Sequence, residues 1–517
     1  MLYVQLNEAN FEYDIHSLVK AYFPQEDVLV SAQEKQPAEG VSFRLAIDYL
    51  KKEDGAGTEA ILFQVLEPVQ GASDDTQLPD AFDGEDAAAM IGEFLLKKTA
   101  DVEVDFSDRK ETKNRLKQAL YNLLADYTGT TLPWGTLTGI RPTKIPMAML
   151  EEGKSEAEIE SYMKETYFAS QEKIDLSMEV AKAELELLQK IDYENGYSLY
   201  IGIPFCPSTC LYCSFTSYPI GVWSKRVDEY LDALEKEIEY TARVCKNKHL
   251  NTIYIGGGTP TSLNPEQLDR LLTKVEDCFD FSHLLEYTVE AGRPDSITRE
   301  KLQVLRDHNI SRISINPQTM KDATLKLIGR NHTVAQTVES FKLARELGFD
   351  NINMDLIVGL PEETIQDVER TMKQLMELEP DNVTVHSLAV KRAARLRMQQ
   401  EDYKDLKMEN TWDTIALTAD YAKRMGMTPY YLYRQKNMAG NFENVGYAKS
   451  GCAGIYNILI MEEKQTIMAL GAGATTKFVM GERIERVGNV KDVTNYLERI
   501  DEMIERKAKE MEELGWL

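Results

Sequence analysis

From residue 198 onward the sequence alternates short apolar runs with amphipathic segments, and this alternation constrains the fold more than any other feature. The segments between the runs repeat apolar residues every three or four positions, as helices do. Strands that alternate with helices form parallel sheets and are buried on both faces. We therefore expect an α/β fold with six βα units, curled into a full or partial barrel. The six runs are residues 198–205, 252–258, 285–292, 312–318, 351–359 and 382–388.

Each of these runs ends in a chemically unusual group, and the C-terminal ends of parallel strands are where function collects. Glycines let a backbone approach a ligand closely, and carboxylates accept hydrogen bonds from a ribose or an ammonium group. The structural alternative for each group is a tight turn or a helix cap. The groups are, in chain order, Cys206, the turn Gly256-Gly257-Gly258-Thr259-Pro260, Glu290, Gln318, Asp355 and the basic stretch at 390–397.

Three cysteines lie in the loop after the first run with the spacing C-x3-C-x2-C: Cys206, Cys210 and Cys213. Six cysteines in 517 residues make a disulfide framework improbable. Structural zinc needs four protein ligands, and the candidates for a fourth, Cys245 and His249, lie at the far end of the next predicted helix. A 4Fe-4S cluster prefers thiolates, and three of them leave one iron open to an outside ligand. The triplet therefore favours an iron–sulfur cluster with an open iron.

The order of these features resembles the radical S-adenosylmethionine (SAM) superfamily. The triplet follows the first strand, GGGTP follows the second, and Glu, Gln and Asp stand at later strand ends. The resemblance implies a partial (β/α)6 barrel whose three cysteines hold a 4Fe-4S cluster, while the open iron chelates the amino and carboxylate groups of SAM. It also implies a low-potential electron donor such as flavodoxin or ferredoxin. One electron then cleaves SAM to methionine and a 5′-deoxyadenosyl radical, which abstracts an unactivated hydrogen.

Within the superfamily, LYIGIPFC, CLYC, YIGGGTPT, RISINPQ, GRNH and NMDLIVGLPEET are similar to the oxygen-independent coproporphyrinogen III oxidase group. The C-terminal PYYLYRQKNMAGNFENVGYAKSG is similar to its coproporphyrinogen dehydrogenase branch in anaerobic bacteria. The resemblance covers roughly residues 130–517. It implies a cytosolic enzyme that oxidatively decarboxylates two propionates of coproporphyrinogen III to give protoporphyrinogen IX in heme biosynthesis.

The resemblance also implies which residues contact the cluster and SAM. The two that would flank the cluster and SAM are Tyr200 and Tyr212. Those that would meet the methionine amine through backbone and hydroxyl are Gly257, Gly258 and Thr259. Glu290 would meet the amine or the ribose. Those that would bind the carboxylate and the ribose hydroxyls are Gln318, Arg330 and Asp355.

The chain departs from the group's pattern at two positions. Gly202 stands where the group usually has a His, and Phe215 stands where it has a further Cys after the triplet. Neither position is an implied cluster ligand, so we expect SAM cleavage to be retained.

Two other functions stay open. One is a heme-binding chaperone of the same fold, although its His-Asn-x-x-Tyr motif is missing because no His follows His386. The other is a radical SAM enzyme that opens or methylates heme.

The charge of the chain limits its partners. Lys and Arg total 59 against 85 Asp and Glu, a net charge of −26, which disfavours nucleic acid and anionic lipid. A substrate with four propionates would need a local cluster of cations, because Arg pairs bidentately with carboxylates while Tyr packs on a tetrapyrrole. The alternative for such cations is a solvated helix face. The candidates are Lys391, Arg392, Arg395 and Arg397 after the sixth run, and Arg434 and Lys436 in the Tyr-rich segment.

The remaining regions predict a four-part organisation. We expect a small α+β domain of unknown role over 1–109, a helical bridge over 110–195, the radical SAM barrel over 196–397, and an α+β lid beside the sheet over 398–517. The apolar run IYNILIM at 455–461 is expected to be a strand, and the acidic connector at 71–90 a solvated loop. Before residue 190, only Arg141 and Lys144 in GIRPTK suggest contact with an anion.

Cellular location is predicted from what the sequence lacks. No stretch approaches the ~18 apolar residues of a membrane span, and the N-terminus has no basic and apolar signal-peptide pattern. We therefore expect a soluble cytoplasmic protein, with the oligomeric state, the electron acceptor and the number of bound SAM molecules left open.

Overall fold

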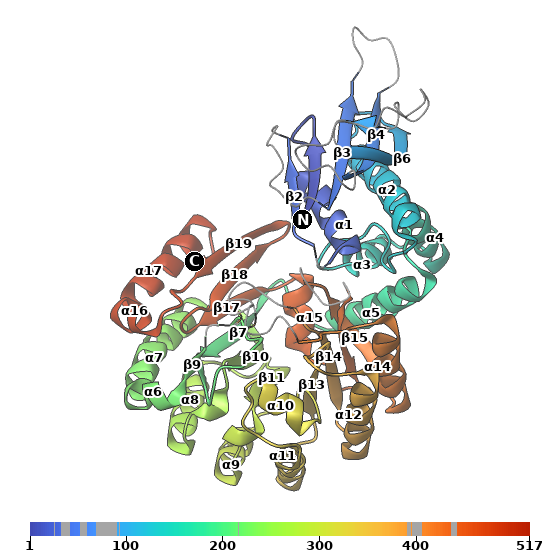
Figure 1. The fold of residues 1–517 in the computed structure, drawn as a ribbon. Helices are drawn as coiled ribbons and strands as arrows, with labels where there is room; N and C mark the ends of the chain where they lie inside the picture. Colours follow the sequence, from blue (N-terminus) through green and yellow to red (C-terminus); the bar gives the residue numbers. More distant parts are fainter. Residues whose placement is uncertain are drawn as a thin grey trace. The chain divides into compact units, whose positions relative to one another are not determined.

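The chain divides into two compact units, Met1–Met178 and Glu179–Leu517, with the division inside helix α5 (Gln171–Leu188) (Figure 1). The acidic connector up to residue 89 and the cations Lys391, Arg392, Arg395, Arg397 and Lys436 lie outside the described residues. The computed structural model describes residues 1–24, 26–32, 42–51, 59–68, 90–91, 94–215, 217–389, 394, 396, 406–435 and 442–516.

The first unit is built on a six-stranded sheet in the order β2-β1-β3-β4-β6-β5. Burial alternates along β3, so one face of the sheet forms a core against α1 and α2. The expected small N-terminal α+β fold is therefore confirmed. The strands are β1 (Leu2–Leu6), β2 (Val28–Ser31), β3 (Phe43–Leu50), β4 (Ala60–Pro68), β5 (Met90–Ile91) and β6 (Phe94–Glu103), and the helices are α1 (Glu12–Tyr22), α2 (Arg109–Thr128), α3 (Lys144–Glu151) and α4 (Glu156–Tyr167).

Helix α2 illustrates how the sequence sets an element's ends. The Asp108 side chain accepts a hydrogen bond from the Glu111 backbone N–H at the start, and Gly129, with φ of 68°, ends the helix in the left-handed region. The helices expected in the range 110–195 are present here and at α5. Arg141 and Lys144 lie in this unit, just before and at the start of α3.

The second unit holds an eleven-stranded mixed sheet in the order β15-β16-β14-β13-β12-β11-β10-β7-β17-β18-β19. Six strands in its middle are mutually parallel and follow chain order, as expected from the alternating runs. They are β7 (Gly196–Ile203), β10 (His249–Gly257), β11 (Glu286–Gly292), β12 (Arg312–Ile315), β13 (Ile352–Val358) and β14 (Asn382–Ser387).

Helices follow these strands and cover the outer face of the sheet (Figure 1). Both faces of the parallel strands are buried, as in β12, where all four residues are buried. Capping boxes at Asn264, Thr333 and Thr364 define where three of the helices begin. The helices are α7 (Val227–Val244), α8 (Pro265–Cys278), α9 (Arg299–Asp307), α10 (Asp322–Leu327), α11 (Val334–Glu346), α12 (Ile365–Leu378) and α14 (Trp412–Arg424).

The C-terminal strands extend this sheet at both edges, so the expectation of a lid packed beside the sheet is wrong. Strands β15 (Thr428–Tyr433) and β16 (Asn444–Ala448) continue it antiparallel beyond β14. On the other side β17 (Thr466–Leu470) pairs parallel with β7, followed by β18 (Thr475–Met480) and β19 (Arg483–Gly488). Without these partners, β14 and β7 would be edge strands with unpaired backbone groups.

The run IYNILIM forms helix α15 (Ile455–Glu462), so the expectation of a strand there is also wrong. The Glu286 side chain accepts a hydrogen bond from the backbone N–H of Ile455, and a carboxylate at a helix N-terminus is favourable. The helix lies against β10 and β15, and the Tyr456 ring stacks on Tyr254 with centroids 4.5 Å apart. A segment this apolar is buried whichever structure it adopts, which is why its pattern was ambiguous.

The last two described helices are held against the sheet by hydrogen bonds and an ion pair with a buried carboxylate, Glu237 of α7. Lys507 forms an ion pair with Glu237, and neither side chain is exposed to solvent. The Tyr496 hydroxyl and the Gly471 backbone N–H donate to the same carboxylate at 2.6 and 2.8 Å. This network joins α7, the turn after β17, and the helices α16 (Val493–Glu498) and α17 (Ile500–Glu513). No helix in the described part of the chain has the length and apolar character needed to cross a bilayer.

Candidate active site

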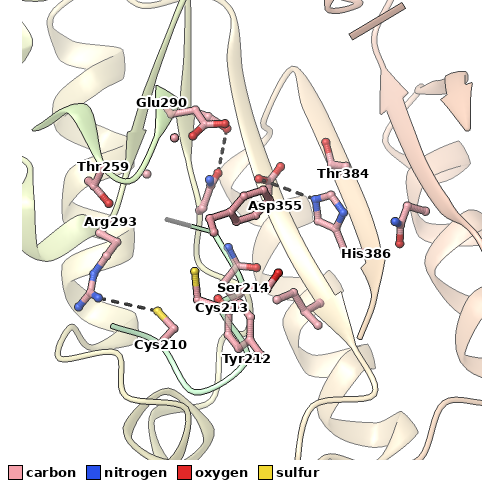
Figure 2. A pocket seen from close by; sticks show the side chains of 18 of the residues that line it. Cys210, Tyr212, Cys213, Ser214, Thr259, Glu290, Arg293, Asp355, Thr384 and His386 are labelled. Atoms are coloured by element: carbon pink, nitrogen blue, oxygen red, sulfur yellow. Dashed lines mark hydrogen bonds and ion pairs between the residues drawn. The ribbon is translucent and has the colours of Figure 1, made fainter. Parts of the chain in front are cut away.

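A cavity of about 360 Å³ lies at the C-terminal ends of the parallel strands of the second unit (Figure 2). It brings together the cysteine loop, the glycine turn and the ends of the later strands, as we expected from the strand order. We call the side of the cavity that is formed by the cysteine loop, the glycine turn and these strand ends the cofactor wall. Its predicted members are Cys206, Cys210, Tyr212, Cys213, Gly257, Gly258, Thr259, Glu290, Gln318, Arg330 and Asp355.

Two predicted residues do not line this cavity. Tyr200, in the middle of β7, is stacked with the rings of Tyr254 and Tyr456 beneath the glycine turn. Arg434 follows β15 and is only 4% exposed, and burial lowers the pKa of its guanidinium to about 10. Its neighbour Gln435 does line the cavity.

Each thiol of the triplet has one polar side chain from outside the triplet beside it. The Thr259 hydroxyl donates to Cys206 Sγ at 3.5 Å, and Arg293 Nη1 donates to Cys210 Sγ at 3.9 Å. The Ser217 hydroxyl lies 4.0 Å from Cys213 Sγ. Burial raises the pKa of the Cys206 thiol to about 11 and also raises that of Cys213. Binding of a metal would therefore have to displace protons from these thiols.

The donor set of the loop suits a 4Fe-4S cluster better than a single ion. Within the described residues, no three His, Cys, Asp or Glu side chains are grouped to hold one metal ion. A cubane cluster does not require such grouping, because each thiolate binds a different iron atom. Three thiols on one cavity wall, with no fourth cysteine among the described residues that line the cavity, fit a cluster with one open iron.

The glycine turn is packed directly on the exit of β7. The backbone N–H groups of Gly258 and Thr259 donate to the carbonyls of Ile203 and Phe205 at 2.8 and 2.7 Å. Gly257 has a φ of 101°, and a Cβ at Gly258 would lie 2.6 Å from the Phe205 oxygen, so neither position accommodates a side chain. These two N–H groups are therefore already used within the protein and are not available to a ligand.

Glu290 and Asp355 are two buried carboxyls with different protonation behaviour. Burial raises the pKa of Glu290 to about 7, and the negative charge of Asp355 adds to this, although the Tyr254 hydroxyl donates to Glu290. Burial also acts to raise the pKa of Asp355, but His386 and Asn353 outweigh it and hold that pKa below its usual range. The His386 ring nitrogen Nε2 lies 3.9 Å from the Asp355 carboxylate (Figure 2).

Two predicted polar residues have buried atoms with no hydrogen-bond partner in the described part of the chain. These atoms are the side-chain oxygen Oε1 of Gln318 and Nε of Arg330. Gln318 also has a φ of 66°, an unusual value for a residue with a side chain. Arg330 Nη1 donates to the Asn316 carbonyl at 2.6 Å. Buried polar atoms are normally paired, so these two indicate that a polar ligand or water completes the site.

Sequence reasoning missed the opposite side of the cavity, which we call the far wall. The rings of Tyr431 and Tyr433 stack with centroids 6.1 Å apart, and the Tyr433 hydroxyl lies 3.3 Å from His386 Nδ1. The Tyr-rich run was a signal, because residues two apart on a strand point to the same face. The far wall consists of Thr384, His386, Tyr431, Tyr433, Gln435 and Asn444.

Arg293 and Arg312 of the cofactor wall were also missed. Arg293 directly follows the third predicted strand in EAGRP, and that position at a strand end was the available signal. Arg312 is the first residue of β12 and is 2% exposed, and the sequence carried no signal that would separate it from a surface arginine.

Known proteins resemble this chain over most of its length. A sequence model described as the radical SAM superfamily matches residues 200–375. The oxygen-independent coproporphyrinogen-III oxidase-like protein HemZ of Bacillus subtilis is 42% identical over 411 residues, covering 78% of this chain and 82% of HemZ. The heme chaperone HemW of the same organism is 35% identical over 308 residues, covering 59% and 76%. The oxygen-independent coproporphyrinogen III oxidase of Salmonella typhimurium is 27% identical over 309 residues, covering 60% and 66%.

Proposed function

The chain belongs to the radical SAM superfamily, in the oxygen-independent coproporphyrinogen III oxidase-like group, and from this membership we propose that it is a tetrapyrrole-processing enzyme. Its proposed reaction is the oxidative decarboxylation of two propionates of coproporphyrinogen III, which yields protoporphyrinogen IX. The names of the HemZ and Salmonella relatives support this substrate.

The family implies a 4Fe-4S cluster and SAM, and the three cysteines needed for the cluster are present. When bound and reduced by an external donor such as flavodoxin or ferredoxin, these groups would supply a 5′-deoxyadenosyl radical able to take a β-hydrogen from a propionate. Loss of CO2, with transfer of one electron to an external acceptor, would then leave a vinyl group. In this proposal Cys206, Cys210 and Cys213 are the cluster ligands. Their placement on one cavity wall supports that role.

The other members of the cofactor wall would bind SAM. The carbonyl oxygens of the glycine turn and the carboxylate of Glu290 would accept hydrogen bonds from its ammonium group. Asp355, which is held ionised, would accept from the ribose hydroxyls. The unpaired atoms of Gln318 and Arg330 would be satisfied by the ribose and the carboxylate. Tyr200 would support Gly257 from beneath. Its hydroxyl approaches this glycine so closely that a Cβ added there would lie only 3.0 Å from it.

The substrate would lie between the two walls. The six parallel strands would form a partial (β/α)6 barrel, and the C-terminal strands would supply its substrate-facing side. The stacked Tyr431 and Tyr433 offer a flat aromatic surface to a pyrrole ring. The propionates would be held by the predicted cations Lys391, Arg392 and Arg395, and not by Arg434, which does not line the cavity.

The observation that carries this proposal is the single cavity that joins a cluster-binding loop to an aromatic wall. The test is anaerobic incubation of the reconstituted full-length protein with SAM, a reductant and coproporphyrinogen III. We expect 5′-deoxyadenosine and protoporphyrinogen IX together, and neither from a Cys206→Ala variant. Formation of 5′-deoxyadenosine without a decarboxylated product would rule out this substrate, and analysis of other tetrapyrrole products would then identify ring opening or methylation.

A second candidate function is heme binding without turnover, and the 35% identity to the chaperone HemW favours considering it. A chaperone would bind heme in a stoichiometric complex. Titration with heme, followed by absorbance, separates the two functions. Saturable binding of one heme per chain without decarboxylation would favour the chaperone, and the enzyme would give product without a stable heme complex.

A further inference from the structure

Arg293 is almost fully buried under the cysteine loop, and every nitrogen of its guanidinium is engaged. Its side chain is 3% exposed. Nε and Nη2 donate to the two carboxylate oxygens of Asp295 at 2.9 and 2.7 Å. Nη1 donates to the carbonyl and the hydroxyl of Ser208 at 2.9 and 2.8 Å and also reaches Cys210 Sγ (Figure 2). Asp295 therefore fixes the guanidinium so that one nitrogen faces the loop.

The loop around Cys210 is held from a second direction by residues that precede α11. The Ser208 hydroxyl donates to the Gly329 carbonyl at 3.0 Å, and the Leu211 backbone N–H donates to the Ile328 carbonyl at 2.9 Å. These contacts already position the loop backbone. The bond from Arg293 to the sulfur is additional to them, and it acts on the thiol itself.

The three thiols of the triplet therefore differ in their environments. The side chains beside the Cys206 and Cys213 sulfurs at hydrogen-bond distance are neutral hydroxyls, those of Thr259 and Ser217, and the guanidinium groups of Arg293 and Arg330 act on these two thiols only electrostatically. Cys210 has the guanidinium of Arg293, the one charged group among the described residues with a recorded hydrogen bond to a triplet sulfur. Hydrogen bonds to ligand sulfurs are a main control of cluster reduction potentials, and charged donors are the stronger ones.

We propose that Arg293 is a positioning residue that orients Cys210 and raises the reduction potential of the cluster. This inference rests on the proposed function, because it requires the 4Fe-4S cluster on the triplet. Reduction adds one electron from the external donor to the cluster and breaks no bond, so the reduced state carries one more negative charge. A cation held beside one ligand stabilises that state more than the oxidised state.

The test is an anaerobic redox titration of the full-length protein, with the reduced cluster followed by electron paramagnetic resonance. The variants are Arg293→Gln and Arg293→Lys, and the matched control is Arg299→Gln, an exposed arginine paired with Glu346. At a fixed potential we expect the ratio of reduced to oxidised cluster to fall roughly tenfold in Arg293→Gln. The ratio for Arg293→Lys should lie between those for Arg293→Gln and the wild type, and the ratio for Arg299→Gln should equal that of the wild type.

Iron content is measured on the same samples and separates positioning from folding. A full cluster with the wild-type potential in both Arg293 variants would overturn the inference. If Arg293→Gln fails to load a cluster, a second variant without the charge, Arg293→Met, replaces it, and a wild-type potential in that variant overturns the inference. A wild-type protein that binds no 4Fe-4S cluster would instead refute the proposed function itself, so the two failures are distinguishable.

Discussion

The cofactor wall and the far wall line the same cavity but differ in chemistry and in origin. The cofactor wall carries thiols, carboxyls and guanidinium groups at the ends of five parallel strands. The far wall carries tyrosine rings, amides and one imidazole, from β14 and the antiparallel strands β15 and β16. No Lys or Arg is found among the described residues of the far wall. One side is thus built for charge and the other for shape and aromatic contact.

This difference suggests a division of labour. A zwitterionic cofactor requires preset charges, whereas a flat ring system requires surface that can be desolvated at low cost. The walls meet where β13 pairs with β14: Asp355 lies beside Thr384 in the sheet, and His386 stands between Asp355, at 3.9 Å, and the Tyr433 hydroxyl, at 3.3 Å. Variants of one wall should therefore affect mainly SAM and variants of the other mainly substrate, with crossover expected between these two strands.

The largest expected effect is on the cluster. Replacing Cys206, Cys210 or Cys213 with Ala removes one of three ligands, so iron content and the ~400 nm absorption expected of such a cluster should collapse. Cys245, Cys278 and Cys452 serve as controls, and their Ala variants should keep the cluster. A triplet variant that retains a full cluster would show that another residue is a ligand.

The next largest effect concerns substrate affinity, through two cations predicted from the sequence alone. If Arg392 and Arg395 hold propionates, changing both to Ala removes charged pairs of roughly 1.5–3 kcal/mol each, or about one to two decades of substrate affinity apiece. Substrate-independent SAM cleavage should not change. Wild-type substrate affinity in the double variant would mean that this stretch is a solvated face and that the propionates are bound elsewhere.

On the cofactor wall, Asp355→Asn should weaken SAM without changing the cluster. The variant removes a negative charge that is held ionised in the cavity, so we expect about one to two decades lower SAM affinity by calorimetry. Asp420→Asn, on the exposed face of α14, is the matched control. An unchanged affinity would place the ribose away from β13.

Glu290 should make SAM binding depend on pH. Its carboxyl has a pKa of about 7, so it is largely neutral at pH 6 and ionised at pH 8. Because an ammonium group pairs with the ionised form, SAM affinity should rise about tenfold between these values. Glu290→Gln should abolish the rise. If the variant shows the same pH dependence of SAM affinity as the wild type, that dependence arises from a different group.

The smallest expected effect is on the far wall. Tyr433→Phe keeps the ring and removes the hydroxyl that meets His386, so substrate affinity should fall roughly two- to tenfold. SAM affinity should be unchanged, as in the control Tyr13→Phe in the first unit. An equal loss for SAM and substrate would mean that the two walls act as one site.

The cofactor wall was predictable because its residues stand where recognisable strands end. The C-terminal ends of parallel strands lie at the same edge of a sheet, so Glu290, Gln318 and Asp355 could be placed near one another from the sequence alone. The far wall was not predictable in this way. His386 and Tyr433 come from β14 and β15, which are each paired antiparallel with β16 between them, and this pairing cannot be read from any one strand's own pattern.

Two errors have related physical causes. Residues 455–461 are apolar except for Asn457, and the contacts that accompany the helix there, such as those with Glu286 and Tyr254, are made with residues far away in the sequence. The pairing of β17 with β7, which the expected lid did not include, depends on which edge of the sheet is open. In both cases the deciding interaction is tertiary, and local periodicity does not carry it.

The pairing of β7 with β17 bears on how the protein is made. The cysteine loop is synthesised directly after β7, whereas β17 and Lys507 lie much further along the chain and are synthesised much later. Until then β7 is an open edge, and contacts between such distant segments form slowly. We therefore expect stable cluster insertion to follow translation, and a nascent chain halted before residue 466 to leave its thiols exposed to oxidation.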